Sequence, residues 1–199
     1  MKILVIGASG TIGQAIVDQL KPTHEVVTAG HRSGDHQVDL ANPDSIVRLF
    51  EAVGTVDAII SAAGQAAFGP LSQQTDADFA LALNNKLMGQ VNLVRLGREH
   101  VREGGSITLT SGILSRYPIP GSSSVAMANG ALESFVRAAA LELDSLRLNV
   151  VAPAFVKETM VMMGMDPSPG ISAVDTARAY IEALTGSAHG ETLDLNAPA

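Results

Sequence analysis

Short apolar runs alternate along the chain with stretches in which apolar residues recur every three or four positions. The run Lys2–Ile6 is typical of a buried strand, and Thr11–Leu20 places its apolar side chains on one helical face before Pro22 ends the helix. The same alternation predicts further strands at Glu25–Ala29, Gln37–Leu40, Thr55–Ala62, Ser106–Thr110, Arg147–Ala152 and Glu191–Leu195.

Helical patterns separate these strands. The segment Asn42-Pro43-Asp44 is a strong helix start, because asparagine caps the first turn, proline suits the first helical position and an acid complements the helix dipole. Further helices are expected from Asp76 to about Val101, with a possible bend near Asn84-Asn85, at Ser122–Leu143 and at Val174–Leu184. Strands rich in Val and Ile between helices indicate an α/β, doubly wound, mostly parallel sheet of about seven strands with helices on both faces.

The segment Lys157–Ser172 is the least regular part of the chain, with two prolines and two glycines. Two readings are open: a mobile lid or substrate loop over a site, or a surface connection. Its four methionines suit an adaptable apolar pocket, but they also suit an interface.

A glycine-rich turn follows the first strand and leads directly into a helix. It reads Gly7-Ala8-Ser9-Gly10-Thr11-Ile12-Gly13. Glycines allow a sharp turn and a close approach of phosphate to the backbone, and the helix N-terminus supplies free N–H groups. The position between strand and helix favours a dinucleotide site in a single Rossmann-type domain over residues 1–199. A tight turn that binds no ligand is the alternative.

Composition narrows the choice of partners. Thirteen basic and 20 acidic residues give a net charge of −7, which argues against nucleic acid, and the chain has no cysteine for thiolate chemistry or metal binding. No apolar stretch is long enough for a transmembrane helix, so we expect a cytoplasmic protein without a membrane partner. His24, His31 and His36 offer no regular ligand geometry, and no metal site is expected.

The end of the second strand bears on cofactor choice. NAD sites usually place an acid there to bind the adenosine ribose, whereas this chain reads Ala29-Gly30-His31-Arg32-Ser33 and has no acid before Asp35. Arg32 can pair with a 2′-phosphate and Ser33 can add a hydroxyl donor, which favours NADP(H). The alternative is that His31 and Arg32 are solvated loop residues.

With these motifs, the chain resembles the short-chain dehydrogenase/reductase family over nearly its whole length. The glycine spacing is nearer the family's extended and atypical branches than its standard short form. Further segments resemble the family's adenine-contacting aspartate, its Asn-Asn-Ala-Gly stretch, its catalytic-serine segment, the end of its central helix and its nicotinamide-packing segment. These are Asp39-Leu40, Ser61-Ala62-Ala63-Gly64, Thr110-Ser111-Gly112, Arg137–Leu143 and Val151-Ala152-Pro153-Ala154-Phe155-Val156, with Ala154 where glycine is usual.

The resemblance implies NADP(H) as cofactor and a set of residues that bind it. The expected set is Gly7, Ser9, Gly10, Thr11, Ile12, Gly13, His31, Arg32, Ser33, Asp39, Leu40, Ala62, Ala63, Gly64, Asn129, Pro153 and Val156. It also implies a homodimer or homotetramer, assembled through the helices Gln90–Arg102 and Ser122–Leu143.

The family's catalytic Tyr-x-x-x-Lys pair is missing. Matching the central helix places Val125 at the tyrosine position and Asn129 at the lysine position, while Ser111 keeps the spacing of the catalytic serine. Valine exchanges no proton, and asparagine can bind ribose hydroxyls but carries no positive charge.

The family's upstream asparagine position is also altered. Counting back from Gly89 places Lys86 there, although a shift of one or two residues would restore Asn84 or Asn85. A buried Lys86 beside Ser111 could have a lowered pKa and donate a proton, whereas the alternative is an exposed helical lysine. Tyr117 is a less direct proton source in a loop, and Tyr180 is expected to be a packing residue.

Two functions remain open on these residues. The first is an atypical NADP(H)-dependent oxidoreductase that transfers hydride to or from an unidentified carbonyl or alcohol, with Ser111 and Lys86 as catalytic residues. The second is an NADP(H)-binding protein without turnover, such as a redox sensor or an interaction protein.

Overall fold

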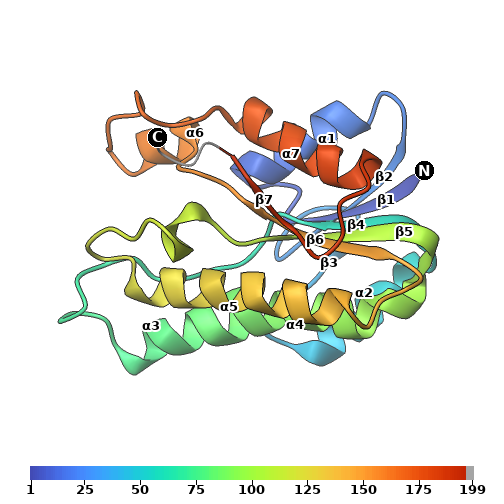
Figure 1. Ribbon diagram of the computed structural model, residues 1–199, viewed down its shortest axis with the longest axis horizontal. Coiled ribbons are helices and arrows are strands. Elements are labelled where there is room, and N and C mark those ends of the chain that lie inside the picture. The colour runs from blue at the N-terminus through green and yellow to red at the C-terminus, as the bar shows by residue number, and fades with distance from the viewer. Residues whose placement is uncertain (196–199) are drawn as a thin grey trace.

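The computed structural model describes residues 1–195 and shows a seven-stranded parallel sheet in the order β3-β2-β1-β4-β5-β6-β7 (Figure 1). The expected α/β doubly wound class is confirmed. The strand order reverses direction between β1 and β4, which in such sheets opens a crevice at the carboxyl ends of the strands. The strands are β1 (Lys2–Ile6), β2 (Glu25–Gly30), β3 (His36–Gln37), β4 (Val56–Ser61), β5 (Val101–Thr110), β6 (Arg147–Ala152) and β7 (Thr192–Asp194).

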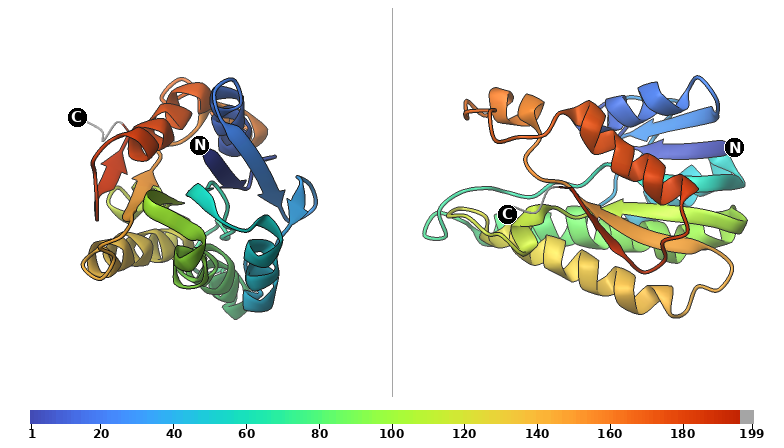
Figure 2. Two further views of the ribbon diagram at one scale, coloured as in Figure 1. Left: turned by 90° about the vertical axis from the view of Figure 1, so that its right-hand side faces the viewer. Right: turned by 45° about the horizontal axis from the view of Figure 1, so that its top comes forward.

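Helices cover both faces of the sheet, which lies between the two helix layers in Figure 2. Helices α1 (Thr11–Leu20) and α7 (Ala173–Thr185) form one layer, and α2 (Pro43–Val53), α4 (Met88–Gly97) and α5 (Ser123–Ala140) form the other. The shorter helices are α3 (Asp76–Leu81), α6 (Lys157–Met162) and the 3₁₀ turns η2 (Arg98–His100) and η3 (Ile113–Ser115). In residues 1–195, no helix combines the length and apolar character that a membrane crossing requires.

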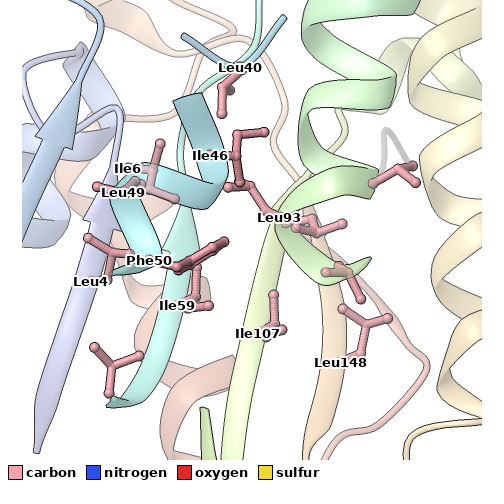
Figure 3. Packing of buried hydrophobic residues seen from close by; sticks show 14 of the residues in the cluster. Leu4, Ile6, Leu40, Ile46, Leu49, Phe50, Ile59, Leu93, Ile107 and Leu148 are labelled. Atoms are coloured by element: carbon pink, nitrogen blue, oxygen red, sulfur yellow. The ribbon is translucent and has the colours of Figure 1, made fainter. Parts of the chain in front are cut away.

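The alternation of side chains along each strand divides the core into two clusters. Leu4, Ile59, Ile107 and Leu148 are register partners across β1, β4, β5 and β6, and all four are fully buried toward α2, α4 and α5. Figure 3 shows this row beside Phe50 of α2. The neighbouring strand residues face α1 and α7, so both faces of the parallel sheet are apolar.

The predicted start of α2 is confirmed by its cap. The Asn42 side chain accepts hydrogen bonds from the backbone N–H groups of Asp44, at 3.0 Å, and Ser45, at 3.4 Å, with Pro43 in the first turn. The predicted bend near Asn84-Asn85 falls inside a π turn, η1 (Ala82–Leu87), which joins α3 to α4. Such turns insert an extra residue in a helix and often lie at functional sites.

Two predicted strands had the wrong boundaries, whereas the helical stretch predicted from Asp76 to about Val101 is confirmed, since η2 continues α4 to His100. Strand β3 is His36–Gln37 rather than Gln37–Leu40, because the chain leaves the sheet to enter the Asn42 cap. Strand β5 begins at Val101 rather than Ser106, because the pairing of β4 with β5 continues across a register shift between Val56 and Ala58. Propensity cannot show such an irregularity.

The segment 157–172 is more ordered than its sequence indicates. It contains α6, and it closes on itself where the Lys157 N–H donates to the Ile171 carbonyl at 2.8 Å and the Ile171 N–H donates to the Phe155 carbonyl at 3.0 Å. Met160 is buried, whereas Met162 and Met163 are exposed.

Candidate functional site

Two cavities of about 270 Å³ each lie at the carboxyl ends of the central strands. Both are lined by Ala63 and Gly64, just beyond β4, so the two cavities adjoin at this edge of the sheet, and the pair is called the groove below. The outer cavity is lined by Ile6, Gly7, Ser9, Gly30, His31, Val38, Asp39, Leu40, Ala63, Gly64, Gln65 and Asn85. The inner cavity is lined by Ile12, Ala62, Ala63, Gly64, Lys86, Thr110, Ser111, Gly112, Ile113, Leu114, Val125, Asn129, Pro153, Ala154, Phe155, Val156 and Thr159.

Backbone contacts shape the glycine turn between β1 and α1. Gly7 has φ +82°, in the left-handed region, and a Cβ there would lie 2.7 Å from the Ala62 carbonyl oxygen. A Cβ on Gly13 would lie only 2.0 Å from the Gly7 carbonyl oxygen. Both positions therefore require glycine, and helix α1 lies close to the end of β1.

The start of α1 suits an anion. Gly10 occupies the N-cap position, no side chain caps this end, and the first turn carries no acid. The backbone N–H groups and positive potential of the helix start therefore have no side-chain cap, and the neighbouring Ser9 and Ile12 line the outer and the inner cavity. These residues fit the pyrophosphate of a dinucleotide, although Gly10, Thr11 and Gly13 do not themselves line either cavity.

Asp35, the first acid after β2, is bound to Thr28 and not to the outer cavity. One carboxylate oxygen of Asp35 accepts hydrogen bonds from the Thr28 backbone N–H, at 2.9 Å, and from the Thr28 hydroxyl, at 2.8 Å. These bonds hold the pKa of Asp35 below its usual value. Arg32 and Ser33 are exposed and follow His31 in the sequence, but they line neither cavity.

Asp39 and Leu40 reach the outer cavity from the loop after β3. The Asp39 carboxylate accepts the Ala41 N–H at 2.9 Å, which holds this loop in place. Asn85, on the π turn, accepts the Gln65 N–H at 2.8 Å and closes the opposite wall. The outer cavity thus combines segments from β1, β2, β4 and the π turn.

The inner cavity contains a buried lysine. Lys86 is only 8% exposed, and its Nζ donates to the Ser111 carbonyl oxygen at 3.2 Å. Burial lowers the pKa of Lys86 from 10.5 to about 8. Gln90 positions this turn, because its Nε2 donates to the Lys86 carbonyl at 3.1 Å and to the Thr110 carbonyl at 2.8 Å.

Glu133 lies behind Ser111 and was not found by sequence reasoning. Its carboxylate is buried on α5 and accepts hydrogen bonds from the hydroxyls of Ser111, at 3.0 Å, and Ser115, at 2.6 Å. Arg116 lies 3.5 Å from the same carboxylate and also pairs with Asp194 of β7. A network of polar groups therefore joins the floor of the inner cavity to the last strand.

Comparison with known proteins identifies the family. A family model described as enoyl-(acyl carrier protein) reductase matches residues 9–188. The chain belongs to the short-chain dehydrogenase/reductase family.

Among curated members of the short-chain dehydrogenase/reductase family, two fungal relatives illustrate the similarity. Hydroxynaphthalene reductase arp2 of Aspergillus fumigatus is 30% identical over 176 residues, which cover 80% of this chain and 64% of that protein. Short chain dehydrogenase claC of Passalora fulva is 33% identical over 147 residues, or 70% of this chain and 53% of that protein. The chain therefore spans less than two thirds of these relatives.

Solved structures match over almost the full length. The protein lin1944 from Listeria innocua is 42% identical, with a TM-score of 0.93 over 98% of this chain and 100% of that one. A small-chain dehydrogenase in complex with NADPH is 27% identical, with a TM-score of 0.87 over 98% of this chain and 96% of that one.

The positions at which this chain departs from the family's catalytic residues lie together in the structure. Val125 and Asn129 lie one turn apart on α5, and both line the inner cavity with Ser111 and Lys86. Lys86 is thus buried rather than the exposed helical residue that the sequence left open.

The two tyrosines have different surroundings. Tyr117 is 43% exposed and lines neither cavity, so its side chain does not reach the site in this structure. Tyr180 is fully buried against Thr110, with 2.6 Å between their hydroxyl oxygens, and burial raises its pKa. Its predicted packing role is confirmed.

Sequence reasoning missed several residues whose position depends on long-range contacts. Gln90 and Glu133 bind backbone and hydroxyl groups that lie 20 and 22 residues away in the sequence. A charged residue within the apolar face of a helix is the one signal that could have indicated Glu133. Val38 and Gln65 of the outer cavity, and Ile113, Leu114 and Thr159 of the inner cavity, carry no motif of their own.

Proposed function

We propose that the groove binds NADP(H) and that the protein transfers hydride between this cofactor and a small carbonyl or alcohol substrate. The observation that carries this proposal is that the two cavities adjoin at Ala63 and Gly64. The outer cavity is lined by part of the glycine turn before the uncapped helix start, and the inner cavity is lined by Lys86, Ser111 and Asn129. This arrangement of the two cavities suits a dinucleotide whose reactive end lies beside polar groups.

The end of β2 supports NADP(H) rather than NAD(H). The nearest acid, Asp35, is bound to Thr28 and does not line the outer cavity. Arg32 and Ser33 are exposed and directly follow His31, which lines the outer cavity, and a guanidinium and a hydroxyl there can bind a 2′-phosphate. NADPH is also the compound named for one of the similar solved structures.

The residues of the inner cavity have two proposed roles, contact with the substrate and transfer of a proton. The cofactor supplies the hydride when bound. Pro153 and Val156 form an apolar wall, and Ile113, Leu114 and Phe155 extend it toward a substrate with little charge. Lys86, with its pKa lowered to about 8, can hold or release a proton at Nζ near neutral pH.

Ser111 is the second catalytic residue that we propose, and its geometry limits its role. The carboxylate of Glu133 only accepts, so the Ser111 hydroxyl directs its proton toward Glu133 and offers lone pairs to the cavity. Donation to a carbonyl oxygen from Ser111 requires that this hydroxyl rotate, whereas Lys86 has N–H groups to spare.

The same hydrogen bond favours a second candidate function, NADP(H) binding without turnover. With Val125 in place of a proton-exchanging side chain and the Ser111 proton held by Glu133, the site contains fewer groups that can act on a substrate. A redox sensor or an interaction protein requires only the cofactor site.

Calorimetry with NADPH, followed by absorbance measurements of NADPH consumption across a panel of small carbonyls, separates these functions. We expect binding, and turnover that falls about a hundredfold or more in Ser111→Ala. Ser187→Ala, at an exposed position after α7 that lines neither cavity, is the matched control. Binding without turnover favours the second function, and absence of binding contradicts both.

Assembly and loop motion complete the proposal. We propose a homodimer or homotetramer in which α4 and α5 pair with their copies, and a substrate loop at 157–172, whose Thr159 lines the inner cavity. Size-exclusion chromatography with light scattering tests the assembly, and a protein that is monomeric at micromolar concentration contradicts it.

A further inference from the structure

Lys86 and Asn129 approach the same stretch of backbone from two different helical segments. Lys86 Nζ donates to the carbonyl oxygen of Ser111, and Asn129 Nδ2 donates to the carbonyl oxygen of Gly112, each at 3.2 Å. The two side chains therefore meet at consecutive peptide groups just beyond β5. Both line the inner cavity.

Neighbouring glycines make room for both side chains. A Cβ on Gly64 would lie 3.0 Å from Lys86 Cγ, and a Cβ on Gly112 would lie 2.9 Å from Asn129 Nδ2. Gln90 further ties the π turn that carries Lys86 to the end of β5. The pair is therefore a built arrangement with positions supported by backbone, rather than two side chains that happen to be near each other.

Both side chains retain unused hydrogen-bonding capacity. A lysine ammonium has three donors, and one goes to Ser111. The bond from Nδ2 to Gly112 sets the orientation of the Asn129 amide, and Oδ1 is buried with no hydrogen-bond partner among residues 1–195. Spare donors on one side and a spare acceptor on the other match adjacent hydroxyl groups, which both accept and donate.

Charge strengthens this match. Lys86 makes no ion pair within 4.0 Å in the described part of the chain, and the buried acid Glu133 is already bonded by Ser111, Ser115 and Arg116. An ammonium that is buried without a carboxylate is costly, so stability does not account for the presence of Lys86.

We propose that Lys86 and Asn129 together hold the hydroxyl groups of the nicotinamide-side ribose, with the cation supplied by the π turn and the neutral amide by α5. This inference rests on the proposed function. The family pattern described above has asparagine where this chain has Lys86 and lysine where it has Asn129, so the two residue types are exchanged across the cavity. Lys86 then serves as a cofactor-positioning residue as well as a proton carrier.

A comparison of two ligands tests the proposal without any need for turnover. NADPH contains the nicotinamide-side ribose, whereas adenosine 2′,5′-bisphosphate contains only the adenosine half. Lys86→Met should weaken NADPH binding about ten- to a hundredfold, as expected for hydrogen bonds to a charged group, and should leave adenosine 2′,5′-bisphosphate binding within about twofold. Lys21→Met, which removes an exposed lysine, is the matched control and should change neither.

An exchange of the two residues gives the sharper test. Lys86→Asn should weaken NADPH binding as Lys86→Met does, and the double variant Lys86→Asn with Asn129→Lys should restore most of the loss, because the cation returns to the same pair of carbonyls from the other side. Calorimetry measures the affinities, and circular dichroism checks the fold of each variant.

Each contrary result has a distinct meaning. Equal NADPH affinity in Lys86→Met and the parent overturns the pairing, and so does an equal loss for both ligands. A folded double variant that binds NADPH no better than Lys86→Asn overturns the exchange. If the double variant does not fold, the affinities of Lys86→Met for NADPH and for adenosine 2′,5′-bisphosphate still test the proposal. A parent protein that binds neither ligand instead contradicts the proposed function.

Discussion

Gly7 and Gly13 shape the glycine turn beside the outer cavity through contacts with backbone atoms, whereas Lys86, Ser111 and Glu133 shape the inner cavity through side chains from three separate segments. In the glycine turn, a few consecutive residues between one strand and one helix determine the geometry. In the inner cavity, hydrogen bonds between residues more than 20 positions apart determine it. The comparison shows that one groove can contain a part set by local sequence and a part set by tertiary contacts.

The largest effect is expected when the local part is broken. Gly13→Val brings a Cβ to within 2.0 Å of the Gly7 carbonyl oxygen unless α1 moves away from the sheet. We expect the free energy of unfolding to fall by about 3 kcal/mol. NADPH binding should weaken about a hundredfold or more, because the N-terminus of α1 moves with the helix. Chemical denaturation and calorimetry measure the two effects.

Gly69→Val is the control for that substitution, since a Cβ at Gly69 meets nothing within 4 Å. A Gly13→Val protein that is folded and binds NADPH like the parent would show that the nucleotide does not use this turn.

The next largest effect is expected on the preference for NADPH over NADH, which tests whether residues beside the outer cavity bind the 2′-phosphate. Arg32→Asp replaces a favourable charge pair with repulsion, so the ratio of NADPH to NADH affinity should fall about ten- to a hundredfold. Arg48→Asp makes the same charge change on exposed α2 and should leave the ratio unchanged. Equal affinities of the parent for the two cofactors would refute the preference.

A gain of function sharpens the account of the inner cavity. Val125→Tyr places a phenol on α5 in the cavity that Lys86 also lines. Because Lys86 already supplies a cation there, this single change should raise carbonyl reduction with NADPH about tenfold or more. Addition of Asn129→Lys should contribute less, since it places a second cation beside Lys86. No gain on any carbonyl, with NADPH binding retained, would favour the function without turnover.

The smallest effect concerns the stability of the free protein and its dependence on pH. The pKa of Lys86 falls from 10.5 in the unfolded chain to about 8 in the fold, so unfolding takes up a proton between these values. Raising the pH through this window therefore stabilises the folded parent. Lys86→Met lacks this dependence, and at pH 7 it should be more stable by about 1 kcal/mol after the lost bond to Ser111 is counted.

Denaturation of both proteins at pH 7 and pH 10, without ligand, measures that difference. The buried acid Glu133 accepts a hydrogen bond from Ser111, and it is present in both proteins. A parent that is equally stable relative to Lys86→Met at both pH values would contradict the lowered pKa.

Much of the fold could be predicted because strand and helix periods are local signals. The glycine turn, the Asn42 cap and the buried row that includes Leu4 and Ile59 follow from spacing alone. The start of β5 could not be predicted, because a register shift extends its pairing with β4. Helix α6 was also missed, since its six residues depend on the closure of segment 157–172 by backbone hydrogen bonds.

The candidate site divides in the same way. Family spacing identified Ser111, Lys86 and Asn129 as neighbours of the cofactor, and all three line the inner cavity. It could not show that Glu133 holds the Ser111 hydroxyl, because that bond depends on how α5 packs beside β5. It also could not place Arg32 and Ser33, which lie exposed outside both cavities.

The ion pair between Arg116 and Asp194 has a consequence for synthesis on the ribosome. These residues are 78 positions apart, and Asp194 lies in the last strand of the sheet. The glycine turn emerges early, with its strand, helix and neighbouring strand close behind it, and segments fold broadly in the order of their synthesis. The polar network behind Ser111 is completed only when β7 pairs with β6. The nascent chain therefore acquires the nucleotide-facing half of its groove well before the half in which we place the chemistry.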